Sequence, residues 1–438
     1  MRFNNREHLK KIRIIGLLLL LFQSEVTIAQ LPSQDTLNLT REKAEQLFIE
    51  NNLQILAQKY NVDATQALII QAKLYPNPNI IYGNNIYNNV TNQWFPTSFS
   101  GSSSDNQIQV NQLIILSRKI HKQVKMAETN YKLEEDTLEN LLVTLKFALR
   151  SSFYNIYYLQ QTAKVYNEEI HALKVIVAAY NEVQGKGYVS EAEIVQIQAQ
   201  LYSLQNEYQS LIDNINDQES QLRLLVKVSP ATYIKPEVNP EIVKADPFAY
   251  SYMTLLDSAY TNRSDLMIAK DNLLLSQQTY TYQKALAVPD ITVGPITFFT
   301  QSSNYIPDET FYAFGFSIPI FNRNQGNIKN ARILIDYNNT QVDLTQKTLE
   351  DQVTRGLQKA IDADKLYKGI DLTFAANFDT LASEMMKNYM KRNVNLLTFL
   401  TFYDSYKQNI VQLNTISFNK VNALENINFL TDSDFFNN

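Results

Sequence analysis

The segment SEAEIVQIQAQLYSLQNEYQSLIDNINDQESQLRLLV, residues 190–226, has the clearest periodic pattern in this chain. Its apolar side chains follow one another at intervals of 3, 4, 3, 4, 3, 4, 7 and 3 residues. A mean spacing of 3.5 residues predicts a helix that supercoils left-handedly against a neighbour. Ser190 suits the N-cap of this helix, and Glu191 and Glu193 suit its first turn. The seam consists of Ile194, Ile197, Leu201, Leu204, Tyr208, Leu211, Ile215, Leu222 and Leu225.

The segment before this helix lacks helix breakers. No proline occurs between Pro96 and Pro230, and after Gly101 the only glycines there are Gly185 and Gly187. Residues 117–184 are therefore predicted to form one continuous helix, which would be about 100 Å long. The two helices would form a long antiparallel hairpin with its tip at residues 185–190.

The second half of the chain repeats this layout. Residues 327–390 predict a second long helix with weak points at Gly356 and Gly369, and residues 391–395 form a second tip. Each hairpin is preceded by a predicted helix, at 40–74 and 255–286, that ends before a proline-containing segment. A second apolar seam follows the second tip and consists of Phe399, Phe402, Tyr406, Leu413 and Ile416.

These features predict an internal duplication behind a targeting signal. Five basic residues precede an apolar run at 14–22, and small residues at 27–29 suit cleavage, so residues 1–29 are read as a secretory signal peptide. The apolar run is short for the alternative, a membrane anchor. The first repeat is placed at 30–228, a proline-rich linker at 229–250 and the second repeat at 251–438.

Each repeat contains two candidate strands with alternating side chains. In residues 107–111 and 312–320 the apolar positions recur with a period of two, and the alternate positions are polar or small. This pattern is typical of a strand with lipid on one side and a lumen on the other, although it also fits a soluble sandwich. Four strands cannot close a membrane-spanning barrel, whereas three chains would supply twelve. The predicted lipid-facing side chains are Ile108, Val110, Tyr312, Phe314, Phe316 and Ile318.

The composition excludes several kinds of chemistry. The formal net charge is −5, there is no cysteine, and the only histidines beyond the predicted signal peptide, His121 and His171, stand apart from other ligand residues. These features argue against nucleic-acid binding, thiolate chemistry and a metal site. No catalytic or phosphate-binding motif occurs, so we expect neither an enzyme nor a cofactor. The acidic segments 134–136 and 213–219 are read as solvated helix faces, or alternatively as lumenal groups that attract cations.

Three motifs in this order resemble the TolC family of outer-membrane efflux proteins across residues 38–430. They are LYPNP at 74–78, GYVS at 187–190 and FSIPIFNRNQGNI at 316–328. The third is similar to the strand-to-helix junction of the branch associated with heavy-metal (cobalt-zinc-cadmium or copper) resistance. The resemblance implies a mainly α fold with a small membrane β part: a homotrimer with a 12-stranded outer-membrane barrel above a periplasmic tunnel of helical hairpins.

The resemblance also implies a function and partners. The chain would be a passive exit duct for metal cations or drugs, working with a periplasmic adaptor and an inner-membrane pump of the resistance-nodulation-division type. Asp404 is the candidate gate charge, and Asn393 would take the left-handed conformation that glycine takes in the family. The tips that would dock the adaptor are Gly185, Gly187, Tyr188, Val189 and Ser190 in the first hairpin, and Arg392, Asn393, Val394 and Asn395 in the second.

Two other functions remain open at this stage. The same kind of duct would serve type I protein secretion, with a different pump and cargo. A secreted coiled-coil protein with a structural or adhesive role would also explain the heptads, but not the alternating strands.

Overall fold

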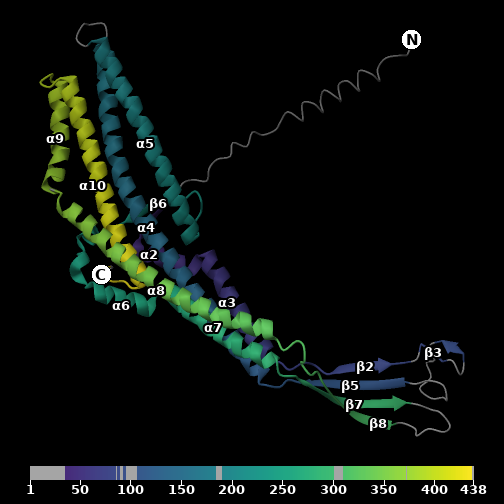
Figure 1. Ribbon diagram of the computed structural model, residues 1–438. Coiled ribbons are helices and arrows are strands. Elements are labelled where there is room, and N and C mark those ends of the chain that lie inside the picture. The colour runs from purple at the N-terminus through teal and green to yellow at the C-terminus, as the bar shows by residue number, and fades with distance from the viewer. Residues whose placement is uncertain are drawn as a thin grey trace, which may run out of the picture.

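The computed structural model describes residues 35–84, 86–88, 92–94, 106–183, 190–299, 309–370 and 372–436. The predicted signal peptide therefore lies outside the described residues. The described chain forms an elongated helical body with a β-sheet at one end (Figure 1). None of the described helices is long and apolar enough to cross a membrane.

The sheet contains four antiparallel strands, as the alternating patterns predict. Their spatial order is β2-β5-β7-β8, so the two outer strands come from different halves of the chain. Each strand of the sheet is continuous in sequence with a long helix that extends away from it (Figure 1). The strands are β2 (Asn79–Gly83), β5 (Asn106–Ile114), β7 (Ile291–Phe299) and β8 (Glu309–Phe316); the two-residue strands β3 (Tyr87–Asn88) and β4 (Gln93–Trp94) form a separate pair.

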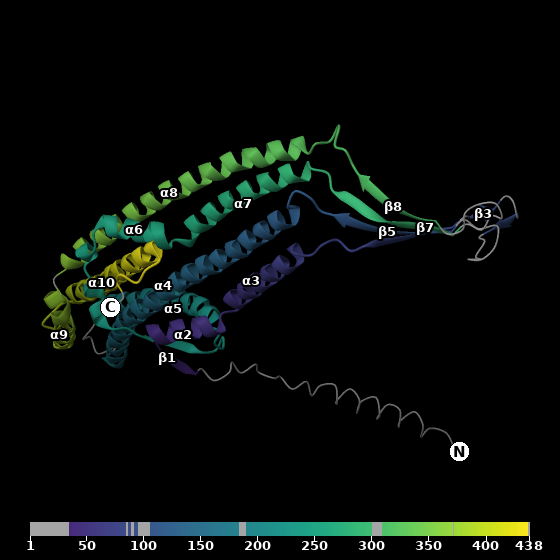
Figure 2. The ribbon, with the colours of Figure 1, turned by 90° about the horizontal axis from the view of Figure 1, so that it is seen from below.

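Four helices next to the sheet form a curved layer. Contacts join α3 to α4, α4 to α7 and α7 to α8, and Figure 2 shows them side by side in that order. This order matches that of the strands to which the helices are connected. The helices are α3 (Leu53–Ala72), α4 (Lys119–Val183), α7 (Ser264–Leu286) and α8 (Gln325–Lys368).

The far half of the molecule consists of the two helical hairpins. The 65-residue α4 continues through it and packs against α5 (Glu191–Val226), which confirms the predicted first hairpin. The second hairpin is formed by α9 (Leu372–Met390) and α10 (Leu396–Thr431), and α10 also packs against α4. Six of the nine seam residues are buried and the other three are partly buried; Ile197, Leu204 and Leu222 have no exposed surface.

Three predicted helices are each two helices in the structure. The predicted helix 40–74 divides at Asn52 into α2 (Arg41–Asn51) and α3, and the predicted helix 255–286 divides at Arg263 into α6 (Tyr252–Asn262) and α7. Both breaks have the same cause. The side chain of Asn52 donates to Leu225 O (3.0 Å) and that of Arg263 to Phe429 O (3.2 Å), so each residue satisfies a carbonyl near the end of a hairpin helix.

The third break separates α8 from α9 near Gly369. Gly369 was expected to be a weak point and is the C-cap of α8. Gly356, the other expected weak point, remains inside the helix. An added Cβ at Gly356 would lie 2.6 Å from Leu430 Cδ1, so this glycine allows α8 and α10 to pack closely.

The segment predicted as a linker also contributes regular structure. Its strand β6 (Tyr233–Glu237) pairs in parallel with β1 (Thr36–Thr40), and two 3₁₀-helices follow, η1 (Pro240–Lys244) and η2 (Pro247–Ala249). Leu39 and Ile234 of the paired strands are fully buried against α2, α4 and α5. The proline-rich composition therefore concealed a strand that joins the start of the described chain to its middle.

One glycine of the sheet is required by the geometry. A Cβ added at Gly294 would lie 1.6 Å from Val110 O of the neighbouring strand, whereas one added at Gly315 would meet only Thr292 Cβ at 3.9 Å. A main-chain carbonyl in a central strand cannot move aside without breaking the pairing of β5 with β7. Gly294 therefore permits the contact between the two halves of the chain.

We expect Gly294→Ala to reduce the yield of folded protein sharply, because the added methyl group separates β5 from β7. Gly315→Ala is the matched control in the same sheet and should fold like the wild type. Folded yield is measured in detergent extracts by resistance to protease and by thermal unfolding. Equal yields for the two variants would contradict this account of Gly294.

Candidate functional site: the hairpin tips and the contacts between the hairpins

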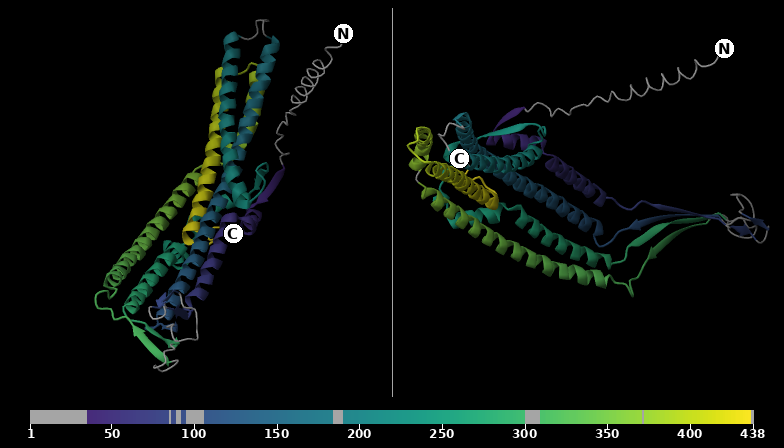
Figure 3. Two further views of the ribbon diagram at one scale, coloured as in Figure 1. Left: turned by 90° about the vertical axis from the view of Figure 1, so that its right-hand side faces the viewer. Right: turned by 90° about the horizontal axis from the view of Figure 1, so that it is seen from above.

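The ends of the two hairpins lie at the same end of the molecule, opposite to the sheet (Figures 1 and 3). Of the residues predicted to dock an adaptor, the described ones at this end are Ser190, Arg392, Asn393, Val394 and Asn395. Gly185, Gly187, Tyr188 and Val189 lie outside the described residues, so only the start of α5 represents the first tip. There Ser190 forms a capping box with Glu193: Glu193 N donates to Ser190 Oγ, and Ser190 N donates to Glu193 Oε2, both at 3.2 Å.

The second tip is a tight turn between two capped helices. Arg392 N donates to Tyr389 O and Asn393 N donates to Asn388 O, both at 2.9 Å, which is the hydrogen-bond pattern of a Schellman motif. Arg392 adopts the left-handed conformation, with φ of 61°. The prediction that Asn393 would adopt it is therefore wrong. Asn395 caps α10, because its Oδ1 accepts from Thr398 N at 2.9 Å. Val394 lies between these two capping motifs.

Aromatic side chains join the hairpins just below the tips. Tyr180 Oη of α4 is 2.5 Å from Tyr389 Oη of α9. The ring of Tyr389 stacks on Phe399 of α10, with centroids 4.4 Å apart, and Tyr403 continues the stack at 4.7 Å. Of these residues, the heptad analysis identified only Phe399. The contacts between Tyr180 and Tyr389 could not be found from periodicity, because they join separate hairpins.

Below the aromatic stack, one lysine connects the second hairpin to the first. Lys407 of α10 is buried, and its Nζ is 2.9 Å from Glu207 Oε2 of α5 and 3.3 Å from Asp404 Oδ1. The same ammonium group lies 5.6 Å from the ring centre of Tyr166 of α4. Asp404, the predicted gate charge, is therefore part of an ionic cluster between the hairpins.

A buried carboxyl group belongs to the same cluster. Glu169 of α4 is 2 % exposed, and within the described residues its Oε2 has no hydrogen-bond partner. Burial raises the pKa of Glu169 to about 7; Lys407 opposes this increase, and the charges of Asp404 and Glu207 add to it. The carboxyl group is thus held close to the point at which it takes up a proton at neutral pH.

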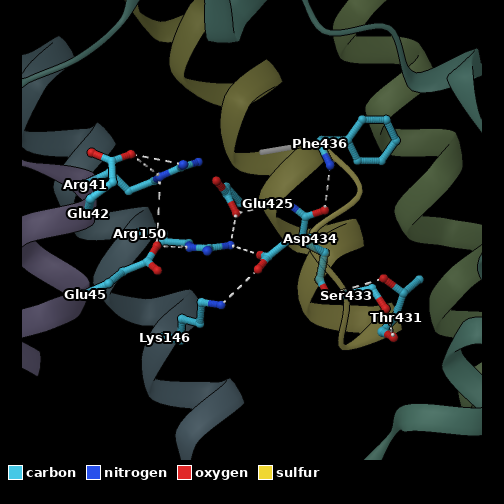
Figure 4. A network of polar contacts seen from close by, with 11 residues as sticks. Arg41, Glu42, Glu45, Lys146, Arg150, Glu425, Thr431, Ser433, Asp434 and Phe436 are labelled. Atoms are coloured by element: carbon cyan, nitrogen blue, oxygen red, sulfur yellow. Dashed lines mark hydrogen bonds and ion pairs between the residues drawn. The ribbon is translucent and has the colours of Figure 1, made fainter. Parts of the chain in front are cut away.

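A second ionic network lies at the opposite end of α10 (Figure 4). Arg150 of α4 contacts Glu45 of α2 (2.7 Å), Glu425 of α10 (3.1 Å) and Asp434 of the C-terminal segment (2.8 Å). Lys146 also reaches Asp434, at 3.2 Å. Arg150 thus joins α4 of the first hairpin to α10 of the second at their bases. Removal of one partner would leave other buried charges uncompensated, so this connection is hard to break.

The predicted lipid-facing side chains share one face of the sheet. Val110 is opposite Ile80, Ile108 is opposite Tyr82 and Thr297, and Phe314 and Phe316 are opposite Val293 and Ile291. Tyr312 and Phe314 are 78 % and 73 % exposed, and Ile318 lies just beyond the end of β8 and is also exposed. The other face has mainly small or polar side chains from Gln107, Gln109, Asn111, Gly294, Ala313 and Gly315.

The described residues contain no group of three or more His, Cys, Asp or Glu side chains that could hold a metal ion. The arrangement instead consists of packed helices, capped turns and ion pairs between helices. Such contacts can stabilise one arrangement of the hairpins relative to another, and they suit a structural or transport role.

Comparisons with known proteins agree with this description. Residues 45–226 match the family described as outer membrane efflux protein. No curated protein sequence matches the chain. Three solved structures share the fold. The Campylobacter jejuni CmeC outer membrane channel has a TM-score of 0.72 and 14 % identity, and the match covers 89 % of this chain and 85 % of that one. CusC has a TM-score of 0.70 and 16 % identity, with coverage of 91 % of this chain and 93 % of that one. The open state of the Neisseria gonorrhoeae MtrE outer membrane channel has a TM-score of 0.66 and 14 % identity, with coverage of 90 % of this chain and 89 % of that one.

The family match covers residues 45–226. The fold of the chain is shared, over about nine-tenths of its length, with the solved outer-membrane channels CmeC and CusC.

We expect Glu169→Gln to flatten the dependence of stability on pH. The pKa of Glu169 in the folded protein is raised above its ordinary value of 4.5, so the folded chain binds a proton at this side chain more tightly than the unfolded chain does. The stability of the wild type therefore falls as pH rises from about 5 to about 8. The amide has no proton to lose, so the variant should unfold at a higher temperature than the wild type above pH 7 and at a similar temperature near pH 5.

Thermal unfolding in detergent, followed by circular dichroism across this pH range, measures the effect. Glu168→Gln removes the exposed neighbouring carboxylate and should keep the pH dependence of the wild type. The same slope for all three proteins would show that Glu169 does not titrate in this range.

Proposed function

We propose that this chain is the outer-membrane exit duct of a tripartite efflux system and that it functions as a homotrimer. The observation that carries the proposal is the open sheet: within the described part of the chain, β2 and β8 each pair on one side only, and they lie at opposite edges. An unpaired strand edge needs a partner, above all inside a membrane, where water cannot satisfy its hydrogen bonds. Three copies joined edge to edge would give a closed barrel of twelve strands around a lumen.

The connectivity of the sheet suits such closure. Three successive antiparallel pairings make β2 and β8 antiparallel to each other, so β8 of one copy can pair with β2 of the next and continue the up-and-down pattern. The outer helices α3 and α8 carry exposed apolar side chains that would meet in the same assembly. On α3 these are Leu56, Tyr60 and Leu68, and on α8 they are Ile333, Tyr337 and Leu344.

The proposed duct is passive and is opened by its partners. A periplasmic adaptor would dock on the tips formed by residues 185–190 and 392–395, and an inner-membrane pump of the resistance-nodulation-division type would supply metal cations or drugs. The adaptor can open the helix ends only by its preference for the open arrangement. In the closed state, the aromatic stack and the Lys407 cluster would hold the second hairpin against the first.

Cysteine cross-linking tests the closure of the ring. The chain has no cysteine, so Ile81→Cys on β2, combined in turn with Phe311→Cys, Ala313→Cys or Gly315→Cys on β8, gives a system without background. We expect one combination to give covalent dimers and trimers on non-reducing gels, because the edges of neighbouring copies are paired. Monomer alone in every combination, or a ladder beyond trimer, would contradict the closed ring.

Single-channel recording tests the role of Lys407. Lys407→Met removes the charge that attracts Glu207 across the two hairpins. We therefore expect a larger channel conductance and more frequent channel openings in planar bilayers. Lys347→Met is the control, because Lys347 pairs with Glu350 of the same helix, at 2.8 Å, and joins no hairpins. Equal conductance of both variants and the wild type would show that the Lys407 cluster does not hold the duct closed.

A further inference from the structure

The junctions between the sheet and the helix layer carry an unusual charge distribution. We define this junction belt as residues 73–78, 115–126, 284–290 and 317–332, which include the ends of α3 and α7 and the starts of α4 and α8. The belt contains nine Lys and Arg residues and one carboxylate, although acidic residues outnumber basic ones in the whole chain, 44 to 39. A basic excess in an acidic protein, confined to one level of the molecule, requires a local explanation.

The single carboxylate of the belt is already neutralised. Asp290 Oδ1 is 2.7 Å from Lys119 Nζ, which also donates to Val288 O at 2.8 Å. The other basic residues of the belt remain as excess positive charge at one level of the molecule. They are Lys73, Arg118, Lys122, Lys125, Lys284, Arg323, Lys329 and Arg332.

Exposed apolar side chains occupy the same level. From Phe316 at the end of β8, the apolar surface continues through Ile318 and Ile320 to Phe321, which is 91 % exposed. Arg323 lies directly beside this surface, because its Nε donates to Ile320 O at 3.1 Å. At the other edge of the sheet, Leu74 and Tyr75 are exposed in the same way.

Two grooves run through the junction belt. One has a volume of about 460 Å³ and lies between Val288 and Ile318, with Lys119 in its wall. The other has a volume of about 670 Å³ and is lined by Leu74, Tyr75 and Ile120. Both volumes are in the range of small-molecule sites, and apolar side chains contribute to both walls.

We propose that the junction belt binds anionic phospholipids, with the apolar grooves taking the upper part of the acyl chains and the basic side chains taking the phosphate groups. This inference rests on the proposed function, in which the sheet lies in the membrane and the helices lie outside it. The lipid-facing surface of the sheet continues directly into the grooves, and the charge of the belt is complementary to a phosphate-bearing surface. Lysine and arginine at such a level extend their charged ends to the headgroups, and aromatic side chains favour the same depth.

The position of the charges fits the thickness of a headgroup layer. Lys125 and Arg332 are the basic residues of the belt furthest along α4 and α8, about 10 Å from the starts of these helices. This distance is similar to the Debye length in physiological salt, so all the belt charges act on one surface. Each such residue adds to the attraction by an anionic membrane surface.

Lipid titration followed by native mass spectrometry tests the proposal on the full chain in detergent. The probes are dioleoylphosphatidylglycerol, dioleoylphosphatidylcholine and inorganic phosphate. We expect phosphatidylglycerol to bind more tightly than phosphatidylcholine, with an affinity that falls as salt increases. Inorganic phosphate at the same concentration should not displace it, because phosphate lacks the acyl chains that occupy the grooves.

The test variant combines Arg323→Gln, Lys329→Gln and Arg332→Gln at the start of α8. We expect it to bind phosphatidylglycerol about tenfold more weakly or worse, with phosphatidylcholine binding unchanged. The matched control combines Arg355→Gln, Lys359→Gln and Lys365→Gln on the same helix. It removes the same charge from exposed positions far from the sheet and should bind both lipids like the wild type.

Three outcomes would overturn the lipid site. If the test variant binds phosphatidylglycerol like the wild type but has altered ion selectivity in bilayers, these charges lie in the lumen. If it binds lipid like the wild type but no longer forms oligomers, the charges lie between copies. Equal loss in both triple variants would reveal a non-specific charge effect. In each case, channel formation by the wild-type chain would leave the proposed duct intact, whereas a wild-type chain that binds no lipid and forms no channel would refute the duct itself.

Discussion

The structure depends on a mismatch of spacing between its two kinds of element. Neighbouring strands lie about 4.8 Å apart and neighbouring helices about 8–10 Å apart, yet each strand here is continuous with a helix in the same order. The chain must therefore spread laterally by about a factor of two between the sheet and the helix layer. This widening occurs in short junction segments that contain Pro76, Pro78, Pro289 and Pro319. Left-handed residues at Ser117, Arg118 and Asn324 redirect the chain where α4 and α8 begin.

The two halves of the chain have similar junctions between strand and helix, but they differ in the continuity of their helices. The first hairpin has a continuous support in α4, whereas the corresponding path in the second half is interrupted between α8 and α9. At the base, the Arg150 network fixes α2, α4 and α10 together. Near the tips, the second hairpin is held by aromatic contacts and by Lys407. A firm base with fewer ionic contacts toward the tip is the arrangement expected of a part that moves about its base.

The sequence predicted the repeating features of the fold well, because they depend on local rules. The absence of proline specified α4, and the 3.5-residue seam specified α5 and its buried face. The breaks at Asn52 and Arg263 were missed because their causes are contacts with Leu225 and Phe429, which are far away in sequence. The strand β6 was missed because Pro236 and its neighbours read as a linker, and because its partner β1 lies at the other end of the repeat.

For the functional site, the tips could be located from glycine, asparagine and capping residues, but their contacts could not. Lys407 is one lysine among many on polar helix faces, and only the packing of α10 against α4 and α5 reveals its burial. The burial of Glu169 could not be predicted either, because it follows the exposed Glu168 and no local pattern distinguishes the two residues. Periodicity identifies which face of a helix is apolar, whereas the identity of the facing charges requires the three-dimensional arrangement.

The pairing of β5 with β7 also determines the order in which the molecule can fold. The helices α4 and α5 are adjacent in sequence and can pack as soon as both have been synthesised, whereas β5 must wait for a strand from the other half of the chain. Closure of such a long loop is slow relative to hairpin formation. The four-stranded sheet is therefore completed only when the chain has been synthesised through Phe316, the last residue of β8. A nascent chain that ends before β8 carries only part of the proposed lipid-facing surface, so this surface requires strands from both halves of the chain.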